Sequence, residues 1–111
     1  MAETTSEAVE PPFFEVNITE VNETVKAGET VEVTANVTNI GDEKDTQEVK
    51  LTDTEFSGEV QDIADVTLSA GESNDSVVLE WDTDSGDVGE GNLTVASDND
   101  TDNQRAVIKG L

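Results

Sequence analysis

Two acidic stretches have side chains that could bind a cation. Asp98-Asn99-Asp100-Thr101-Asp102 places an aspartate at every second position, and a second group, Asp82, Asp84 and Asp87, follows Trp81. Hard oxygen ligands of this kind bind Ca²⁺ when a loop wraps around the ion. The first stretch departs from the EF-hand pattern, because it has no glycine at the sixth position and Lys109 stands where the bidentate glutamate belongs.

We favour a simpler interpretation, in which both stretches are solvated acidic turns. Sequence alone does not bring the two groups together in space. A Ca²⁺ site that draws on Asp98, Asp100, Asp102, Asp82 and Asp84 remains the alternative. No other cofactor is expected.

Catalytic chemistry has little support in the composition. The chain has no His, Cys or Tyr, so the usual general bases and the usual partners of a nucleophile are missing. A catalytic carboxylate pair needs one desolvated member, and Glu80, between Leu79 and Trp81, alternates outward. We therefore expect that the protein is not an enzyme.

Six asparagines fit the N-glycosylation acceptor pattern: Asn17, Asn22, Asn36, Asn74, Asn92 and Asn99. About 1.5 would arise by chance from this composition. Alternation along strands accounts for Asn17, Asn36 and Asn92, because it places Asn and Thr two positions apart on the wet face. The other three lie in predicted turns, where this explanation does not apply. Whether at least one of the six sites carries a glycan is a question that the sequence leaves open.

The charge balance limits the classes of partner that the protein can bind. The chain has 27 acidic and 5 basic residues, a net charge of −22 that is spread along its whole length. Molar salt shortens the Debye length to about 3 Å and screens this repulsion, and the composition is that of extreme halophiles. Nucleic acid and anionic membranes are excluded as partners, since both require a basic surface.

Targeting signals are not evident. The start of the chain has neither the basic residues nor the apolar core of a signal peptide, and no stretch approaches the roughly 20 apolar residues of a spanning helix. If the parent protein is exported, we expect this chain to be a fragment of it. Without cysteine there are no disulfides.

A period of two dominates the hydrophobic pattern. In the run from Val31 to Gly41, valines and Ala35 alternate with Glu, Thr and Asn. Similar short runs recur near residues 14–18, 47–53, 58–68, 76–81, 92–97 and 105–110, and glycine turns lie at Gly28 and Gly71. We predict an all-β, immunoglobulin-like antiparallel sandwich of seven or eight strands over residues 13–109, after a flexible linker over residues 1–12.

The core of this sandwich can also be predicted. Val31 to Val37 should face the other sheet and pack against Trp81, Leu79 and Val95. Phe13, Val78 and Val88 should lie outside the core, too scattered to form a patch.

The order of these segments resembles a known family. The matching pieces are Gly28-Glu29, the Val-x-Asn-x-Gly stretch at Val37, Asn39 and Gly41, the Gly71-Glu72 turn, Trp81, and the strand from Gly91. Together they resemble CARDB-type (cell-adhesion-related) domains of bacterial and archaeal surface proteins, over roughly residues 14 to 109. The resemblance implies a non-catalytic seven-stranded sandwich, often repeated in tandem in exported proteins, with no single ligand.

These observations lead to one functional hypothesis. The chain is expected to be a structural or adhesion module of a haloarchaeal surface or secreted protein, acting as a spacer or protein-interaction domain. Its expected partners are other domains or surface proteins, with no direct membrane insertion, and the isolated domain is expected to be monomeric. The alternative is a calcium- or glycan-binding sandwich that uses the acidic loops.

Overall fold

The computed structural model describes residues 9–110 and contains eight strands and one short 3-10 helix, η1. The helix η1 covers Ser85–Asp87. The strands are β1 (Phe14–Val21), β2 (Thr24–Lys26), β3 (Thr30–Asn39), β4 (Asp45–Thr52), β5 (Val60–Leu68), β6 (Ser73–Asp82), β7 (Gly89–Ala96) and β8 (Thr101–Lys109). None of the described residues forms an α-helix, and so none forms a helix that could span a membrane.

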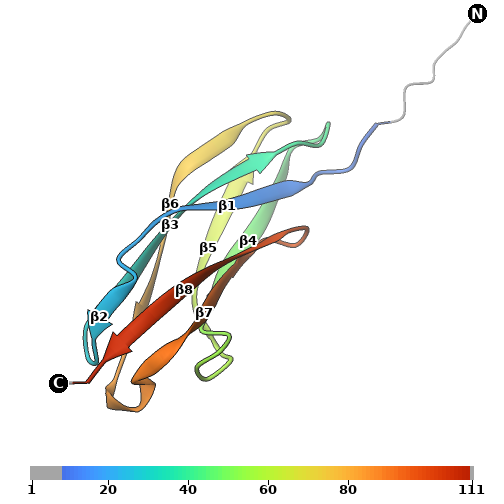
Figure 1. Ribbon diagram of the computed structural model, residues 1–111. Helices are drawn as coiled ribbons and strands as arrows, with labels where there is room; N and C mark the ends of the chain where they lie inside the picture. Colours follow the sequence, from blue (N-terminus) through green and yellow to red (C-terminus); the bar gives the residue numbers. More distant parts are fainter. Residues whose placement is uncertain (1–8, 111) are drawn as a thin grey trace, which may run out of the picture.

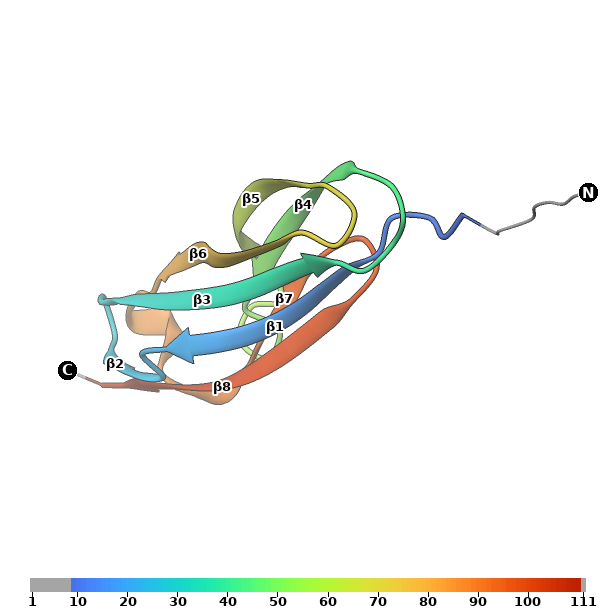
Figure 2. The same ribbon diagram turned by 90° about the horizontal axis from the view of Figure 1, so that it is seen from above.

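The strands form two stacked sheets (Figures 1 and 2). One has three strands in the order β1-β3-β6, and the other has five in the order β2-β8-β7-β4-β5. The predicted β-sandwich is confirmed, with one departure from the antiparallel pattern. Between β1 and β2 the chain crosses from the first sheet to the second, and there β2 pairs with β8 in parallel.

The core lies between the sheets, as the period of two predicts. Val31, Val33 and Val37 have no exposed surface, and Trp81 is 1% exposed. The expected position of the tryptophan was wrong in one respect. Trp81 and Leu79 lie on β6 of the same sheet, as the cross-strand partners of Val31 and Val33.

Val95, by contrast, belongs to the opposite sheet, as expected. The error arose because alternation identifies which side chains point inward, not which strands share a sheet. On β5 the pattern is looser: Val66 and Leu68 are buried, whereas Val60 and Ile63 are each 49% exposed.

Asn39 ties four segments of the chain together. Its side chain is fully buried, and its Nδ2 donates to the carbonyl oxygens of Glu43 and Leu68. Its Oδ1 accepts from the amides of Phe13 and Gly41. One asparagine thus connects the residue before β1, the end of β3, the residues before β4 and the end of β5.

The segment before β1 is held against the sandwich. The Asp42 amide donates to the Glu10 carbonyl, and the Glu10 amide donates to the Asp42 carboxylate. Gly41 allows this close contact, because a Cβ there would lie 2.0 Å from the Pro11 carbonyl oxygen. Of the predicted linker, residues 1–8 lie outside the described residues, and its boundary at residue 12 stays a prediction.

The segment that leads into β1 and the end of β8 lie at opposite ends of the sandwich (Figure 1). We call the end that carries residues 9–13 and the turn 40–44 the N-terminal pole. The end that carries the turn 26–29, the loop 83–88 and residues 109–110 is the C-terminal pole.

Candidate functional site

The acidic stretch 98–102 lies at the start of β8, beside the open edge of β1. The amide of Phe14 donates to Asn99 Oδ1 at 3.0 Å, that of Val16 to Asp100 Oδ2 at 2.9 Å, and that of Ile18 to Asp102 Oδ2 at 2.8 Å. Alternate amides of an edge strand point away from its ladder and require acceptors. The spacing of two that suggested metal ligands therefore matches the spacing of these three amides.

Further contacts fix this stretch. Ser97 Oγ donates to the Phe14 carbonyl at 2.6 Å. The buried Gln47 donates from Nε2 to Asn99 Oδ1 and accepts the Asp98 amide at Oε1. The hydrogen bonds give the stretch a structural role, in which its side chains join the two sheets along one edge.

The opposite edge of the three-stranded sheet has a similar bridge. The amide of Glu80 on β6 donates to Asp62 Oδ2 on β5 at 2.8 Å. The sequence analysis missed Asp62, whose partner lies 18 residues away.

The second acidic group shapes the C-terminal pole. Asp84 caps η1, since its Oδ1 accepts from the Gly86 amide, while Asp87 Oδ2 accepts from the Asp84 amide. Asp82 Oδ1 accepts from the Thr30 hydroxyl at 2.6 Å. Each of these three carboxylates thus has a partner within the fold.

The two acidic groups lie at opposite poles, because β7 runs between the loops that carry them. An eight-residue strand spans roughly 27 Å, so the groups cannot share one ion. Among residues 9–110, no group of three or more His, Cys, Asp or Glu side chains could hold a metal ion. The predicted calcium ligands are therefore dispersed by the fold.

Three of the six asparagines of the acceptor pattern have engaged side chains. Asn22 acts as an extra rung on β3, because its Nδ2 donates to the Thr30 carbonyl and its Oδ1 accepts the Glu32 amide. Asn74 Oδ1 accepts the Ser76 amide beside an irregularity of β6. Asn99 receives the bonds described above. These are the three positions predicted to lie in turns. The prediction is wrong for Asn74, which lies in β6, whereas Asn22 and Asn99 lie between strands.

The other three lie on the outer faces of strands. Asn17 and Asn92 are exposed, and no hydrogen bond of either side-chain amide is found within the described part of the chain. Asn36 is half-buried, and its Oδ1 is buried without a hydrogen-bond partner. As glycan acceptors, Asn17 and Asn92 are sterically the most available, and their use stays a prediction.

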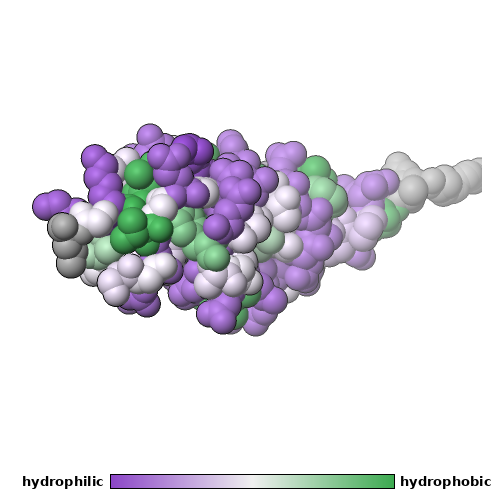
Figure 3. Space-filling view, turned by 60° about the horizontal axis from the view of Figure 1, so that its bottom comes forward, coloured by the Kyte–Doolittle hydropathy of each residue, from purple (hydrophilic) through white to green (hydrophobic). Residues whose placement is uncertain are grey.

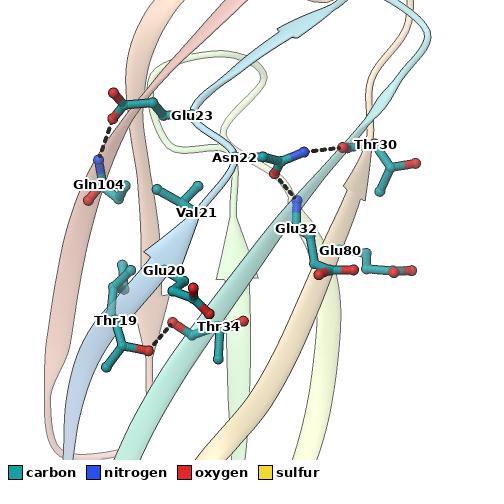
Figure 4. Close-up of a pocket in the computed structure, with 11 residues that line it drawn as sticks. Thr19, Glu20, Val21, Asn22, Glu23, Thr30, Glu32, Thr34, Glu80 and Gln104 are labelled. Atoms are coloured by element: carbon teal, nitrogen blue, oxygen red, sulfur yellow. Dashed lines mark hydrogen bonds between the residues drawn. The ribbon is translucent and has the colours of Figure 1, made fainter.

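An open groove of about 860 Å³ lies beside the end of β1 (Figure 4). Asn22 lies over one side of it, bonded to Thr30 and Glu32, and Glu23 accepts from Gln104 Nε2. Glu20 and Glu80 also line the groove, whose lining contains no Lys or Arg. Its surface is thus polar, acidic and open to water.

The sequence matches no protein-family model and no curated protein. Several solved structures share the fold, and two of them, which are CARDB domains, define its structural class. The class is the immunoglobulin-like sandwich of CARDB domains, so the predicted resemblance is confirmed at the level of the fold.

One such relative is the CARDB domain of a Pyrococcus furiosus protein, crystallised in complex with di-metal ions. It is 13% identical, with a TM-score of 0.69, over 96% of this chain and 100% of that one. A solution structure of the same domain gives a TM-score of 0.65 at 15% identity, over 88% and 94% of the two chains.

Part of a larger enzyme also has this fold. A β-glucosidase from Listeria innocua matches with a TM-score of 0.65 at 23% identity, over 90% of this chain but 16% of the enzyme. The sandwich therefore occurs both as a separate domain and within a multidomain chain.

Proposed function

We propose that this chain is a non-catalytic spacer module, which sets the distance between whatever precedes and follows it. The observation that carries the proposal is the placement of the segment before β1 and of the end of β8 at opposite poles. A sandwich built in this way keeps the segments attached to its two poles a fixed distance apart.

Anchoring of the incoming segment supports the same role. Residues 10–13 are bonded to Asp42, Ile40 and Asn39, so the chain enters β1 along a defined path. At the other pole Ala27 donates to the Lys109 carbonyl, which holds the end of β8. A spacer needs such fixed ends, because a swivelling junction would lose the direction that the sandwich provides.

The setting that we propose is a secreted or cell-surface protein of an extremely halophilic archaeon, in which tandem repetition of the module supports adhesion. The acid excess supports the halophilic part. Asn17 and Asn92 support a glycosylated surface. Repeated modules would gain reach and avidity without a strong single contact.

Joining two and three copies of residues 1–111 in tandem tests the spacer role. Small-angle scattering in molar KCl should show a maximum dimension that increases by a nearly constant amount with each copy. A dimension that levels off would mean that the copies fold back on one another, and would contradict the proposal. Replacing residues 9–12 by Gly-Ser repeats gives a flexible control, whose dimension should increase less per copy.

Metal binding is the second candidate, because the Pyrococcus furiosus domain was crystallised with di-metal ions. Calorimetric titration of CaCl₂ into the chain in molar KCl separates the two functions. The spacer proposal predicts no saturable heat. A one-site isotherm that is lost in Asp84→Ala or Asp98→Ala would establish the calcium-binding alternative.

A further inference from the structure

A pocket of about 270 Å³ lies between the loop 53–59 and the loop that carries η1. Phe56 and Val88 form its apolar wall, and Val88 is 53% exposed. Figure 3 shows apolar surface at the C-terminal pole within a mainly hydrophilic molecule. The polar side chains that line the pocket are Glu55, Ser57, Asp87 and Glu90. Apolar surface with a polar rim marks interaction sites.

The loop 53–59 is held in place by a buried carboxylate. Asp53 is 1% exposed, and its Oδ1 accepts the Glu59 amide at 2.7 Å while its Oδ2 accepts from Ser57 Oγ at 2.6 Å. The Phe56 amide donates to the Asp53 carbonyl at 2.8 Å. These hydrogen bonds fix the backbone on both sides of the phenylalanine that forms the apolar wall.

Gly91 on β7 allows this loop to lie against the sandwich. A Cβ at Gly91 would lie 2.8 Å from Glu55 Cβ and 3.4 Å from the Phe56 ring, so a larger residue would displace the loop. The Phe56 ring also packs against Trp81, with 4.8 Å between the ring centroids and the planes tilted by 56°. The same ring thus contacts the core and lines the pocket.

The opposite wall is fixed by the turn around η1. Asp84 Oδ1 accepts the Gly86 amide, and Asp87 Oδ2 accepts the Asp84 amide. Gly89, which leads from this turn into β7, has a φ of 148°, a conformation that favours glycine. Both walls therefore have defined positions in the free protein, and a preorganised site loses less free energy when a ligand binds.

The carboxylates of the pocket can accept further hydrogen bonds. Glu55 Oε1 accepts the Asn92 amide at 2.7 Å, and Glu90 Oε1 accepts from Arg105. Within residues 9–110 no hydrogen bond is found to Glu55 Oε2, Glu90 Oε2 or Asp87 Oδ1. The described lining residues include no Lys or Arg. The pocket therefore suits a ligand that donates hydrogen bonds and has no negative charge.

A single metal ion does not match this arrangement. No three acidic side chains of the described residues are placed to hold one ion together, so Glu55, Asp87 and Glu90 would contact separate points of a larger ligand. Phe56 and Val88 add apolar surface that an ion does not use. A sugar ring matches both features, because its C–H groups pack on apolar side chains and its hydroxyl groups donate to carboxylates.

We propose that this pocket binds one unit of a neutral saccharide. The sugar ring packs on Phe56 and Val88, while its hydroxyl groups donate to Glu55, Asp87 and Glu90. The acidic lining repels uronic acids and sulfated sugars. The site does not depend on the spacer role and adds a ligand to it. Tandem copies that each bind weakly hold a glycan chain with higher avidity.

Amide spectra of the ¹⁵N-labelled full chain in molar KCl test the proposal. The probes are methyl β-D-glucoside, methyl β-D-galactoside and methyl α-D-mannoside. At least one of them should shift the amides of residues 54–58 and 86–91 saturably, with a Kd of about 1–10 mM, as expected for a ligand of this size. Methyl β-D-glucuronide, which carries a negative charge, should leave these amides unchanged.

Two pairs of variants locate the site. Phe56→Leu keeps an apolar contact with Trp81 but removes the ring, and should raise the Kd about tenfold or more. Phe13→Leu, at the N-terminal pole, is its control and should leave the Kd unchanged. Glu90→Gln should raise the Kd about fivefold. Its control is Glu48→Gln, since both acids form a salt bridge with a basic residue but only Glu90 lines the pocket.

Three results would overturn the saccharide proposal. The first is a spectrum that none of the three glycosides changes. The second is a Kd that Phe13→Leu raises as much as Phe56→Leu. The third is a shift of the pocket amides by CaCl₂ without any shift by the glycosides, which would make the pocket a cation site. The spacer proposal would survive each of these results if the tandem copies still lengthen by a constant amount.

Discussion

Asn39 is the polar side chain on which the N-terminal pole depends. It is wholly buried and uses both Nδ2 and Oδ1 to satisfy four backbone groups, which belong to the residue before β1, the turn 40–44 and the end of β5. Removing it takes the partner away from the Gly41 amide and the Leu68 carbonyl, whose hydrogen bonds to Asn39 are buried.

Asn39→Ala should therefore lower the free energy of unfolding by about 3 kcal/mol. Guanidinium unfolding in fixed molar KCl measures this change. Asn92→Ala, at an exposed asparagine, serves as the control and should change stability by less than about 0.5 kcal/mol. Equal losses in both variants would contradict the role assigned to Asn39.

Val33 is a buried apolar residue on the same strand as Asn39. It has no exposed surface and pairs with Leu79 in the centre of the three-stranded sheet. Val33→Asn buries an amide without a partner and should leave the chain largely unfolded, as measured by the loss of strand-type circular dichroism. A folded Val33→Asn variant would show that this position is not in the core.

The residue-level roles of the acids could not be predicted from sequence. Val16 and Asp100 are 84 positions apart, so nothing local to residues 98–102 identifies the amides that they satisfy. A spacing of two fits both a wrapped cation loop and the outward amides of an edge strand. The inward valines could be predicted, because a period of two is a property of the strand itself.

Strand β1 is bonded on one side by backbone groups and on the other side by side chains. A ladder joins it to β3, whereas side chains of the β8 region bind its outward amides. This arrangement blocks an edge that could otherwise pair with another chain.

Removal of these acceptors should loosen β1 without unfolding the sandwich. In Asp100→Ala/Asp102→Ala the amides of Val16 and Ile18 should exchange with solvent about ten- to a hundredfold faster, because hydrogen bonds to charged groups are lost. Hydrogen exchange followed by NMR measures this directly. Asp98→Ala, whose carboxylate is exposed, is the control, and unchanged exchange in the double variant would contradict the account.

Strand pairing was less predictable than strand position. The runs around 31–39 and 92–96 could be located from alternation, but the short β2 and its parallel pairing with β8 could not. Three residues are too few to show a period, and the pairing depends on where the chain crosses between sheets.

Within residues 9–110 every acid except Asp53, which is 1% exposed, is at least partly exposed at the surface. The carboxylates of the groove in Figure 4 face water with no basic residue in the lining. Self-repulsion at low ionic strength should therefore oppose the compact state.

The melting temperature should accordingly rise from about 0.1 M to molar KCl, as the Debye length falls from about 10 Å to 3 Å. Thermal unfolding followed by circular dichroism measures this rise. Glu20→Gln/Glu32→Gln/Glu80→Gln removes three groove charges and should reduce the salt dependence. A melting temperature that is constant or falls with salt would contradict the halophilic interpretation.

The central claim is that the module holds its two ends at a fixed separation. The chain has no cysteine, so spin labels at Glu10→Cys and Gly110→Cys report on those two sites alone. Pulsed dipolar spectroscopy should give one narrow distance distribution centred above about 30 Å, the length of a nine-residue strand. A broad distribution, or a shorter mean distance, would show that the incoming segment is not anchored and that the chain does not act as a spacer.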